Sequence, residues 1–237
     1  MSVVDGHREP RRAPEGARTR AFEEVLDRIE ERIAAGGLTV GDRLPGERQL
    51  AEELRVSRSS VREALRALAT LGVVSSQVGR GPDAGAVLTS RPDSALTELL
   101  RLNLSLSTLT MREVVDTRLM IEQWAAARAA GDGGAALGEM AQAVAAMDAA
   151  ATPEEFVAHD IAFHMALAAA SGNRLTSAIM RALRDAVRRY AVDAVRRLGD
   201  TADLQADHRR ILDAVRARDA EAATAAVAEH LARAYPS

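Results

Sequence analysis

Hydrophobic residues near the start of the chain recur with the spacing of an amphipathic helix. A helix is predicted up to the glycine pair at 36–37, because the apolar positions of this stretch share one helical face: Phe22, Val25, Leu26, Ile29 and Ile33. Residues 1–20 contain five Arg, two Pro and only scattered apolar residues, so we expect a disordered tail there.

Two more helical patterns and a hairpin pattern follow. Pro45-Gly46 breaks the chain before a short helix that turns Leu50 and Leu54 inward, and Ser57 can cap the next helix by accepting from the N–H of Ser59 or Ser60. Residues 73–78 are typical of a strand, a glycine-rich turn follows, and residues 86–88 are typical of a return strand. The order of three helices and a hairpin predicts a winged helix-turn-helix over residues 21–89.

From residue 96 to residue 237 the hydrophobic pattern is almost wholly helical. It is interrupted by turn-forming residues near 131–134, 152–153, 171–173, 199–200 and 218–219. We therefore predict a linker at 90–95 and then an all-α antiparallel bundle of six or seven helices, which makes the whole protein mainly α.

Composition excludes several classes of protein. The 237 residues include no Cys, so disulfide scaffolds, cysteine nucleophiles, Fe–S clusters and zinc fingers are excluded. No apolar run reaches the ~18–20 residues of a membrane span or resembles a signal peptide, so we expect a cytoplasmic protein without a membrane partner. The formal net charge is −3, and residues 1–92 carry 15 Arg against 14 acidic residues. Binding to nucleic acid must therefore rest on a local basic patch.

One segment has the chemistry of such a patch. Ser57-Arg58-Ser59-Ser60-Val61-Arg62 would begin the third helix, where backbone N–H groups and the positive end of the helix dipole can meet phosphates. Arg58 and Arg62 are four residues apart and share a face opposite the buried Val61. Arg48, on the preceding helix, can reach the DNA backbone.

These residues carry a specific resemblance. The stretch LPGERQLAEELRVSRSSVREALRALATLGVV is similar to the DNA-binding signature of the GntR family of bacterial transcription regulators, and the similarity covers most of residues 20–90. The resemblance implies a winged helix-turn-helix in which Gly79 and Arg80 of the wing approach the minor groove. It also implies contacts between DNA and a set of side chains on the two helices: Arg48, Ser57, Arg58, Ser59, Ser60 and Arg62.

The sequence departs from the family pattern at two places. The turn residue before Val56 is usually Gly and is Arg55 here, so Arg55 is expected in a left-handed conformation at a cost of ~1 kcal/mol. The wing GRGPDAGAVL is also a few residues longer than the compact form of the family.

Histidines of the second domain form a candidate metal site. Asp160 and His164 are four residues apart on one predicted helix and can face the same point, whereas His159 points elsewhere. His208 and His230 lie 11 residues before and after Asp219, the expected N-cap after a helix break. In an antiparallel hairpin both would lie ~16 Å from the turn at ~1.5 Å per residue, level with each other. Three imidazoles and a carboxylate suit zinc first, and also nickel, manganese or iron.

A second resemblance covers roughly residues 112–233. The stretches FVAHDIAFHMALAAASGNRL, DHRRILDAV and AEHL resemble the FCD effector-binding domain of the FadR subfamily of GntR regulators. In metal-binding members the ligands match Asp160, His164, His208 and His230. The resemblance also places Arg118 on the first long helix of that domain, projecting toward the cavity. There it can pair with an effector carboxylate, or instead with Glu122 four residues on.

The leading function is therefore a ligand-responsive transcription regulator, a repressor by analogy with the commoner family behaviour, and not an enzyme. It would act as a homodimer on an inverted-repeat operator of double-stranded DNA, with a small organic acid as effector and a divalent metal as cofactor. Two alternatives remain open. One is a metal-dependent hydrolase or lyase built on the helical domain, and the other is a regulator whose metal is purely structural.

Overall fold

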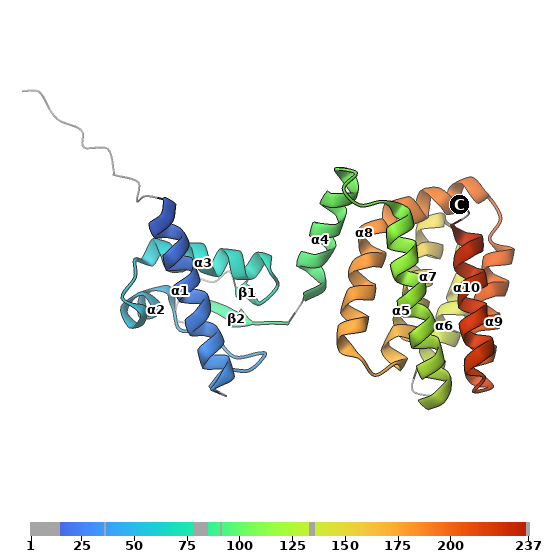
Figure 1. Ribbon diagram of the computed structural model, residues 1–237, viewed down its shortest axis with the longest axis horizontal. Helices are drawn as coiled ribbons and strands as arrows, with labels where there is room; N and C mark the ends of the chain where they lie inside the picture. The colour runs from blue at the N-terminus through green and yellow to red at the C-terminus, as the bar shows by residue number, and fades with distance from the viewer. Residues whose placement is uncertain (1–14, 36, 78–84, 91, 133–135, 236–237) are drawn as a thin grey trace, which may run out of the picture. The chain divides into compact units, whose positions relative to one another are not determined.

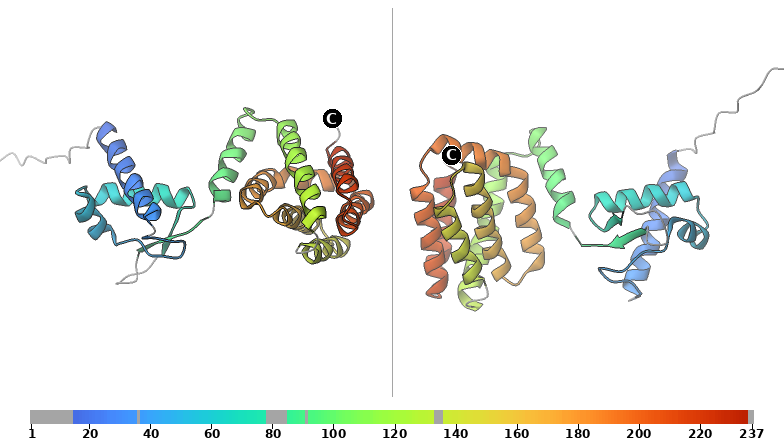
Figure 2. Two further views of the ribbon diagram at one scale, coloured as in Figure 1. Left: turned by 60° about the horizontal axis from the view of Figure 1, so that its bottom comes forward. Right: turned by 180° about the vertical axis from the view of Figure 1, so that it is seen from behind.

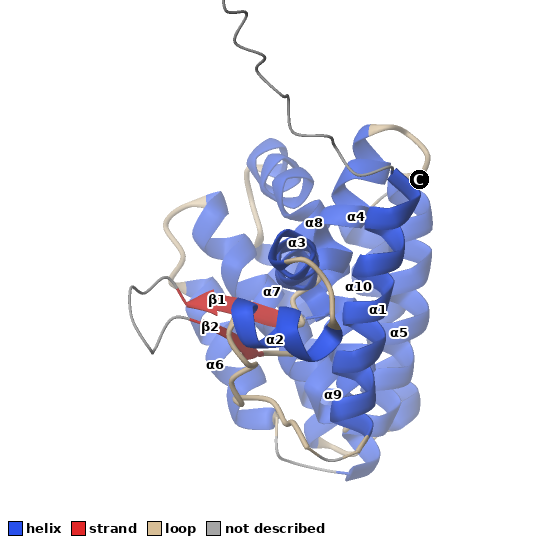
Figure 3. Ribbon diagram, turned by 90° about the vertical axis from the view of Figure 1, so that its left-hand side faces the viewer, coloured by secondary structure: helices blue, strands red, loops and turns tan. Residues whose placement is uncertain are grey.

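The chain divides into two compact units, residues 1–92 and residues 93–237. The computed structural model describes residues 15–35, 37–77, 85–90, 92–132 and 136–235. Helices dominate both units, and the described residues form one two-stranded sheet (Figure 3). No described helix is long and apolar enough to cross a membrane. The predicted mainly α fold class is confirmed.

The first unit has the predicted order of three helices and a hairpin. Its elements are α1 (Glu15–Ala34), α2 (Glu47–Leu54), α3 (Arg58–Thr70), β1 (Val74–Gln77) and β2 (Gly85–Leu88). The strands pair antiparallel, with Val74 opposite Leu88. The core gathers the apolar faces of all five elements, including Val25, Ile29, Leu50, Val61, Leu68 and Leu88. The wing residues Gly79 and Arg80 lie outside the described residues.

Both boundaries of this unit are more helical than expected. Helix α1 begins at Glu15, so the expected disordered tail is wrong for residues 15–20. The stretch EGARTRA has residues of good helix propensity among its Ala and Arg, which extends the helix backward from its apolar face. Helix α4 (Pro92–Ser105) begins inside the expected linker at 90–95, because Pro92 suits a first helical position and Asp93 an acidic first turn.

The second unit is a helical bundle. After α4 it contains α5 (Met111–Asp132), α6 (Leu137–Asp148), α7 (Pro153–Ala170), α8 (Arg174–Leu198), α9 (Ala202–Arg216) and α10 (Ala220–Ala234). Counted over the described residues, the bundle has seven helices, within the predicted six or seven. Helix α10 packs against α5 and α9, and α7 packs against α5, α6 and α8 (Figures 1 and 2). The predicted breaks between helices all fall at helix ends.

Side-chain caps explain why these helices begin where they do. Thr152, Asn173 and Asp219 each accept a hydrogen bond from the backbone N–H groups of the turn that follows. The Asp219 cap was predicted, and it places the reversal between α9 and α10 midway between His208 and His230. The core of the bundle is built from Ala, Leu, Met, Val and Ile with Phe156 and Phe163, as the low aromatic content requires.

Candidate functional site

The start of α3 has the exposed polar end expected of a recognition helix. Ser57 is the N-cap, and its Oγ accepts from the backbone N–H of Ser60 at 3.1 Å, as predicted. The hydroxyls of Ser59 and Ser60 each lie 2.8 Å from Ser57 Oγ. The side chains of Arg58 and Arg48 point into solvent from α3 and α2. A row of hydroxyls and guanidinium groups at a helix N-terminus suits the phosphates and base edges of DNA.

Arg62 on α3 is paired with Glu47, the first residue of α2. Its Nε lies 3.1 Å and its Nη2 2.9 Å from Glu47 Oε2, while Nε also lies 3.3 Å from Oε1. About half of the Arg62 side chain stays exposed, so the guanidinium remains open to a ligand while the carboxylate fixes its plane. This pairing between the two helices was not predicted.

Arg55 takes the left-handed conformation that its place in the turn predicts. It is the C-cap of α2, with φ 54° and ψ 36°. The departure from glycine therefore leaves the geometry of the turn intact, at a cost of about 1 kcal/mol in strain.

In the second unit the four predicted metal ligands meet. One ligand atom each from Asp160, His164, His208 and His230 can be chosen so that all four lie within 4.8 Å of one another. The three histidines are buried, and Asp160 is nearly so. The rings of His208 and His230 have centroids 4.4 Å apart, so the two residues face each other across α9 and α10 as their spacing predicts. His159 does not belong to the cluster.

An oxygen atom lies near the Nδ1 atom of each histidine in the cluster. Nδ1 of His208 lies 2.7 Å from the carbonyl oxygen of Leu204, so Nδ1 must be the donor and Nε2 faces Asp160 Oδ1 at 3.0 Å. Nδ1 of His164 lies 2.5 Å from Glu122 Oε2, in closer contact but poorer alignment than a regular hydrogen bond. Nδ1 of His230 lies 3.8 Å from Asp207 Oδ2. An acceptor behind Nδ1 leaves the Nε2 lone pair free for a metal.

Burial keeps His208 and His230 neutral, and neighbouring positive charges keep Glu122 ionised. Burial, followed by repulsion from His164, lowers the pKa of His208 to about 3, and burial likewise lowers the pKa of His230 well below its ordinary value. Burial alone would raise the pKa of Glu122, but Arg118 and His164 outweigh it and hold that pKa well below its usual range. Neutral imidazole and ionised carboxylate are the protonation states that bind metals.

Two arginines are buried beside this cluster. Arg118 is 0% exposed; its Nε donates to Glu122 Oε1 at 2.9 Å and its Nη1 to the Tyr235 hydroxyl at 3.0 Å. Arg184 is 2% exposed and donates through Nη2 to Asp160. Nη2 of Arg118 and Nε of Arg184 have no hydrogen-bond partner among the described residues. Burial, together with repulsion from Arg118, lowers the pKa of Arg184 to about 10.

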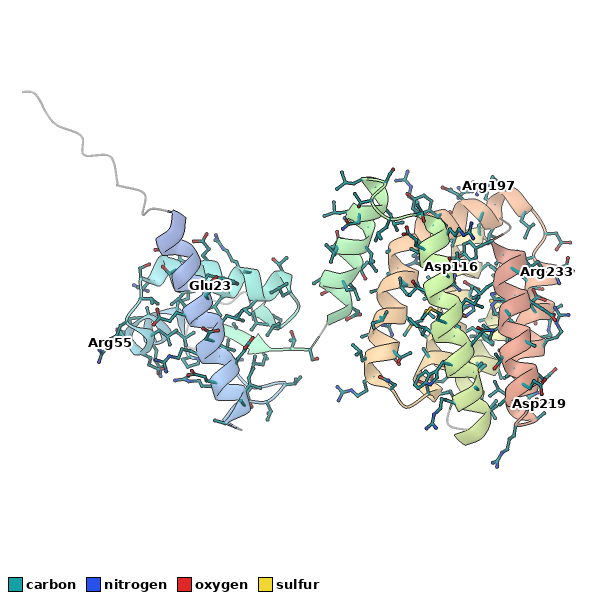
Figure 4. All side chains as sticks on the ribbon, viewed as in Figure 1. Glu23, Arg55, Asp116, Arg197, Asp219 and Arg233 are labelled. Atoms are coloured by element: carbon teal, nitrogen blue, oxygen red, sulfur yellow. The ribbon has the colours of Figure 1, made fainter. Side chains whose placement is uncertain are left out.

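A cavity of about 1000 Å³ opens next to the cluster. Asp160, Arg184, His230 and Tyr235 line it, whereas Arg118 does not, since Tyr235 covers its Nη1. Most of the lining comes from the first turns of α5 and α7 and from the C-terminal parts of α8 and α10, and Leu104 and Leu204 contribute from α4 and α9. Figure 4 shows Arg197, which also lines the cavity, at the end opposite Asp219.

Comparison with known proteins decides the family. The model of the bacterial regulatory proteins of the gntR family matches residues 21–82, and that of the FCD domain matches residues 113–233. The chain belongs to the GntR family. A GntR regulator with an FCD domain is a DNA-binding transcription regulator and not an enzyme, so the predicted role as a transcription regulator is confirmed and the hydrolase or lyase alternative is wrong.

Individual relatives agree with this assignment. The chain is 30% identical to the "Putative L-lactate dehydrogenase operon regulatory protein" of Escherichia coli K12, over 90% of this chain and 84% of the relative. It is 30% identical to the "HTH-type transcriptional regulator LutR" of Bacillus subtilis, over 84% and 92% of the two chains. The solved structure of a Streptococcus agalactiae GntR protein matches 89% of this chain and 96% of its own, with 25% identity and a TM-score of 0.65.

Three polar residues beside the cluster or the cavity are absent from the predictions made from the sequence: Arg184, Asp207 and Tyr235. Arg184 is flanked at helical spacing by the buried Met180, Val187 and Ala191, so an arginine inside an apolar stripe was the available signal. Asp207 gave the same signal between Leu204 and Ile211 on α9. Tyr235, by contrast, follows the last helix and has no local pattern.

Proposed function

We propose that the FCD domain of this regulator binds one divalent metal ion through Asp160, His164, His208 and His230, and that a small organic acid bound beside the ion controls DNA binding. The observation that supports the proposal is the meeting of four ligand atoms in a buried cluster, in which Leu204 O accepts from Nδ1 of His208 and leaves its Nε2 free. Zinc is the first candidate, with nickel, manganese or iron as alternatives.

The geometry of the cluster fits such an ion. Ligands of a tetrahedral ion at ~2.1 Å lie ~3.4 Å apart, so atoms already within 4.8 Å of one another need to move toward the ion by less than ~1 Å. His164 Nε2 is fully buried without a hydrogen-bond partner among the described residues, which is costly unless something binds it. A bound ion would offer its remaining coordination positions to an anionic oxygen.

The effector would bind at the polar end of the cavity. Arg184 lines the cavity with a buried N–H that lacks a partner in the described part of the chain, and guanidinium groups favour carboxylates. Arg118 was predicted to take this role, but its side chain pairs with Glu122 and Tyr235. A direct contact between Arg118 and the effector therefore requires Tyr235 to move aside. A relative named for an L-lactate dehydrogenase operon points toward a carboxylate as well.

The DNA-binding unit would act through the start of α3. We assign DNA contacts to the residues of the predicted set: Arg48, Ser57, Arg58, Ser59, Ser60 and Arg62, with Gly79 and Arg80 in the wing. A homodimer would place two such helices on an inverted repeat, and the effector would shift the population between two spacings of those helices. We expect repression in the absence of the effector.

A thermal-shift screen tests this function. Metal-loaded full-length protein is heated with hydroxy acids, dicarboxylates and sugar acids, because a bound ligand raises the melting temperature by mass action. Acids that stabilise the protein are then tested for release of a DNA duplex selected from a random pool. If the metal-loaded protein is stabilised by none of these acids, or if stabilising acids leave DNA affinity unchanged, the effector role is wrong. Loss of folding on metal removal, without any effector response, would indicate a structural metal instead.

A further inference from the structure

The cavity is much larger than a small hydroxy acid. Its volume of about 1000 Å³ lies at the top of the ~300–1,000 Å³ typical of pockets for drug-sized ligands. A three-carbon hydroxy acid has about six non-hydrogen atoms, and one water molecule occupies ~30 Å³ in the liquid. Such an acid would leave most of the cavity to water.

The buried polar groups of the cavity belong to one connected set. Asp160 and His230 belong to the proposed metal cluster, Arg184 donates to Asp160, and Tyr235 accepts from Arg118. These contacts connect the buried polar side chains of the lining to one another and to the proposed metal cluster. An anionic head group can bind between the metal ligands and Arg184, whose buried Nε lacks a partner among the described residues.

Much of the remaining lining of the cavity forms an apolar wall. Helices α4, α5, α7, α8 and α10 contribute side chains that carry no polar group: Leu104, Met111, Leu119, Phe156, Val195 and Leu231. Contact between such a wall and a hydrocarbon removes apolar surface from water, which lowers the free energy of the complex. The remaining charged lining residues, such as Arg112, Asp116 and Arg197, are exposed to solvent.

From this division we propose that the effector is an amphipathic carboxylic acid with a hydrocarbon tail of about six carbons or more. Its carboxylate occupies the polar end beside Arg184, and its tail lies along the apolar wall. The inference rests on the proposed function, since it names the class of organic acid that the same site takes. Burial of each additional methylene raises affinity about fourfold, so the wall discriminates between acids by tail length.

The experiment is a titration series by isothermal calorimetry on zinc-loaded full-length protein. The probes are acetate, butanoate, hexanoate and octanoate, which share one head group and differ by two methylenes at each step. We expect the dissociation constant to fall about 16-fold per step until the cavity is filled.

Two matched variants show where the tail binds. Ala194 lines the cavity from α8, so Ala194→Phe fills space that the tail needs while leaving the polar end intact. Ala225 is exposed on α10 and does not line the cavity, so Ala225→Phe adds the same ring elsewhere. We expect Ala194→Phe to weaken octanoate binding at least tenfold and to leave acetate binding and zinc content unchanged, whereas Ala225→Phe changes neither acid.

Each other outcome overturns the inference in a recognisable way. Binding of acetate and butanoate with flat or falling affinity for longer acids contradicts the tail but leaves the proposed function standing. Octanoate binding that Ala194→Phe and Ala225→Phe affect equally means that the acid binds outside the cavity. The absence of binding by any of the four acids to zinc-loaded protein contradicts both the tail and the organic-acid effector.

Discussion

At the scale of single residues, the proposed metal site depends on which nitrogen of each ring faces inward. Leu204 O accepts from Nδ1 of His208, whereas Nδ1 of His164 and of His230 lie near Glu122 and Asp207 without a hydrogen bond among the described residues. An acceptor in this position fixes the tautomer and raises the basicity of the coordinating nitrogen. The position of the Asp207 carboxylate is fixed by two hydrogen bonds, because Arg233 Nε donates to it at 3.0 Å and Arg210 donates as well.

The first prediction concerns the ligands. His208→Ala should lose most of the bound metal, because it removes one of four ligands at the centre of the cluster. His159→Ala is the matched control, since it removes a histidine of the same helix as His164 that lies outside the cluster. Elemental analysis of protein purified without chelator or nickel resin measures the result. Equal metal content in wild type and both variants would contradict the site.

The second prediction concerns pH. The pKa of His208 is about 3 in the folded protein and ~6.5 in an unfolded chain, so between these values the unfolded state binds the additional proton. Stability contributed by the neutral ring is therefore complete above pH ~6.5 and is lost as the pH falls. Metal-free protein should lose about 2 kcal/mol of unfolding free energy between pH 8 and pH 5 from this residue.

Urea denaturation at the two pH values measures that loss. His208→Asn serves as the control, because it removes the titrating ring and should show a smaller pH dependence than wild type. His230 contributes in the same direction, so the variant keeps part of the effect. An equal pH dependence in wild type and variant would show that His208 does not titrate in this way.

The meeting of the four proposed metal ligands could be predicted only in part from their spacing. An i, i+4 pair shares one helix face and two residues equidistant from a helix reversal lie level, but only the FCD resemblance brought the two pairs to one site. The pairing of Arg118 with Tyr235 joins residues 117 positions apart in sequence, which local periodicity does not reveal. The same holds for the contact between Arg184 and Asp160, which requires α7 and α8 to be placed first.

At the scale of elements, α3 combines a capped start, an exposed polar face and a buried apolar face. The cap and the apolar spacing could be predicted because both are local. Helices α1 and α4 begin earlier in the chain than predicted. Helix propensity outweighed the Pro, Gly and charged residues that favour a tail and a linker. The pairing of Glu47 with Arg62 could not be predicted, because it depends on the crossing of α2 and α3.

The third prediction concerns this helix. Arg58→Ala should weaken binding to a selected DNA duplex about 5- to 150-fold if Arg58 contacts a guanine. Arg28→Ala on α1 is a control of equal charge, because Arg28 pairs with Glu31 on its own helix. Fluorescence anisotropy at fixed salt concentration measures both, since phosphate contacts depend strongly on salt. Equal effects of the two variants would mean that only net charge matters.

The fourth prediction separates the cap of α3 from its DNA contacts. Ser57→Ala should lower the unfolding free energy by about 1 kcal/mol, because the N–H of Ser60 loses its acceptor. Ser57→Asp restores an acceptor but adds a negative charge where DNA phosphates are expected. We therefore expect Ser57→Asp to recover stability and to bind DNA more weakly than Ser57→Ala. Recovery of both properties together would show that Ser57 acts only as a cap.

At the scale of the whole molecule, the two units have separate hydrophobic cores with no residue in common. Each unit therefore has the apolar burial needed to fold by itself, and a change inside one core need not disturb the other. The division into a DNA-binding and an effector-binding part could be predicted from the change of hydrophobic pattern near residue 90.

The last prediction uses this separation. In His208→Ala the start of α3 and its core are untouched, so affinity for a selected DNA duplex should stay within about twofold of wild type. The effect of a stabilising acid on that affinity should disappear, because the variant loses the metal beside which the acid is proposed to bind. An acid shifts the equilibrium between two states only through a difference in its affinity for them. Anisotropy titrations with and without the acid measure both quantities, and sedimentation of the same samples reports whether the dimer persists. Loss of DNA binding in a His208→Ala protein that remains folded and dimeric would contradict the idea that the metal acts through the effector. It would instead assign the metal a direct part in holding the DNA-binding arrangement.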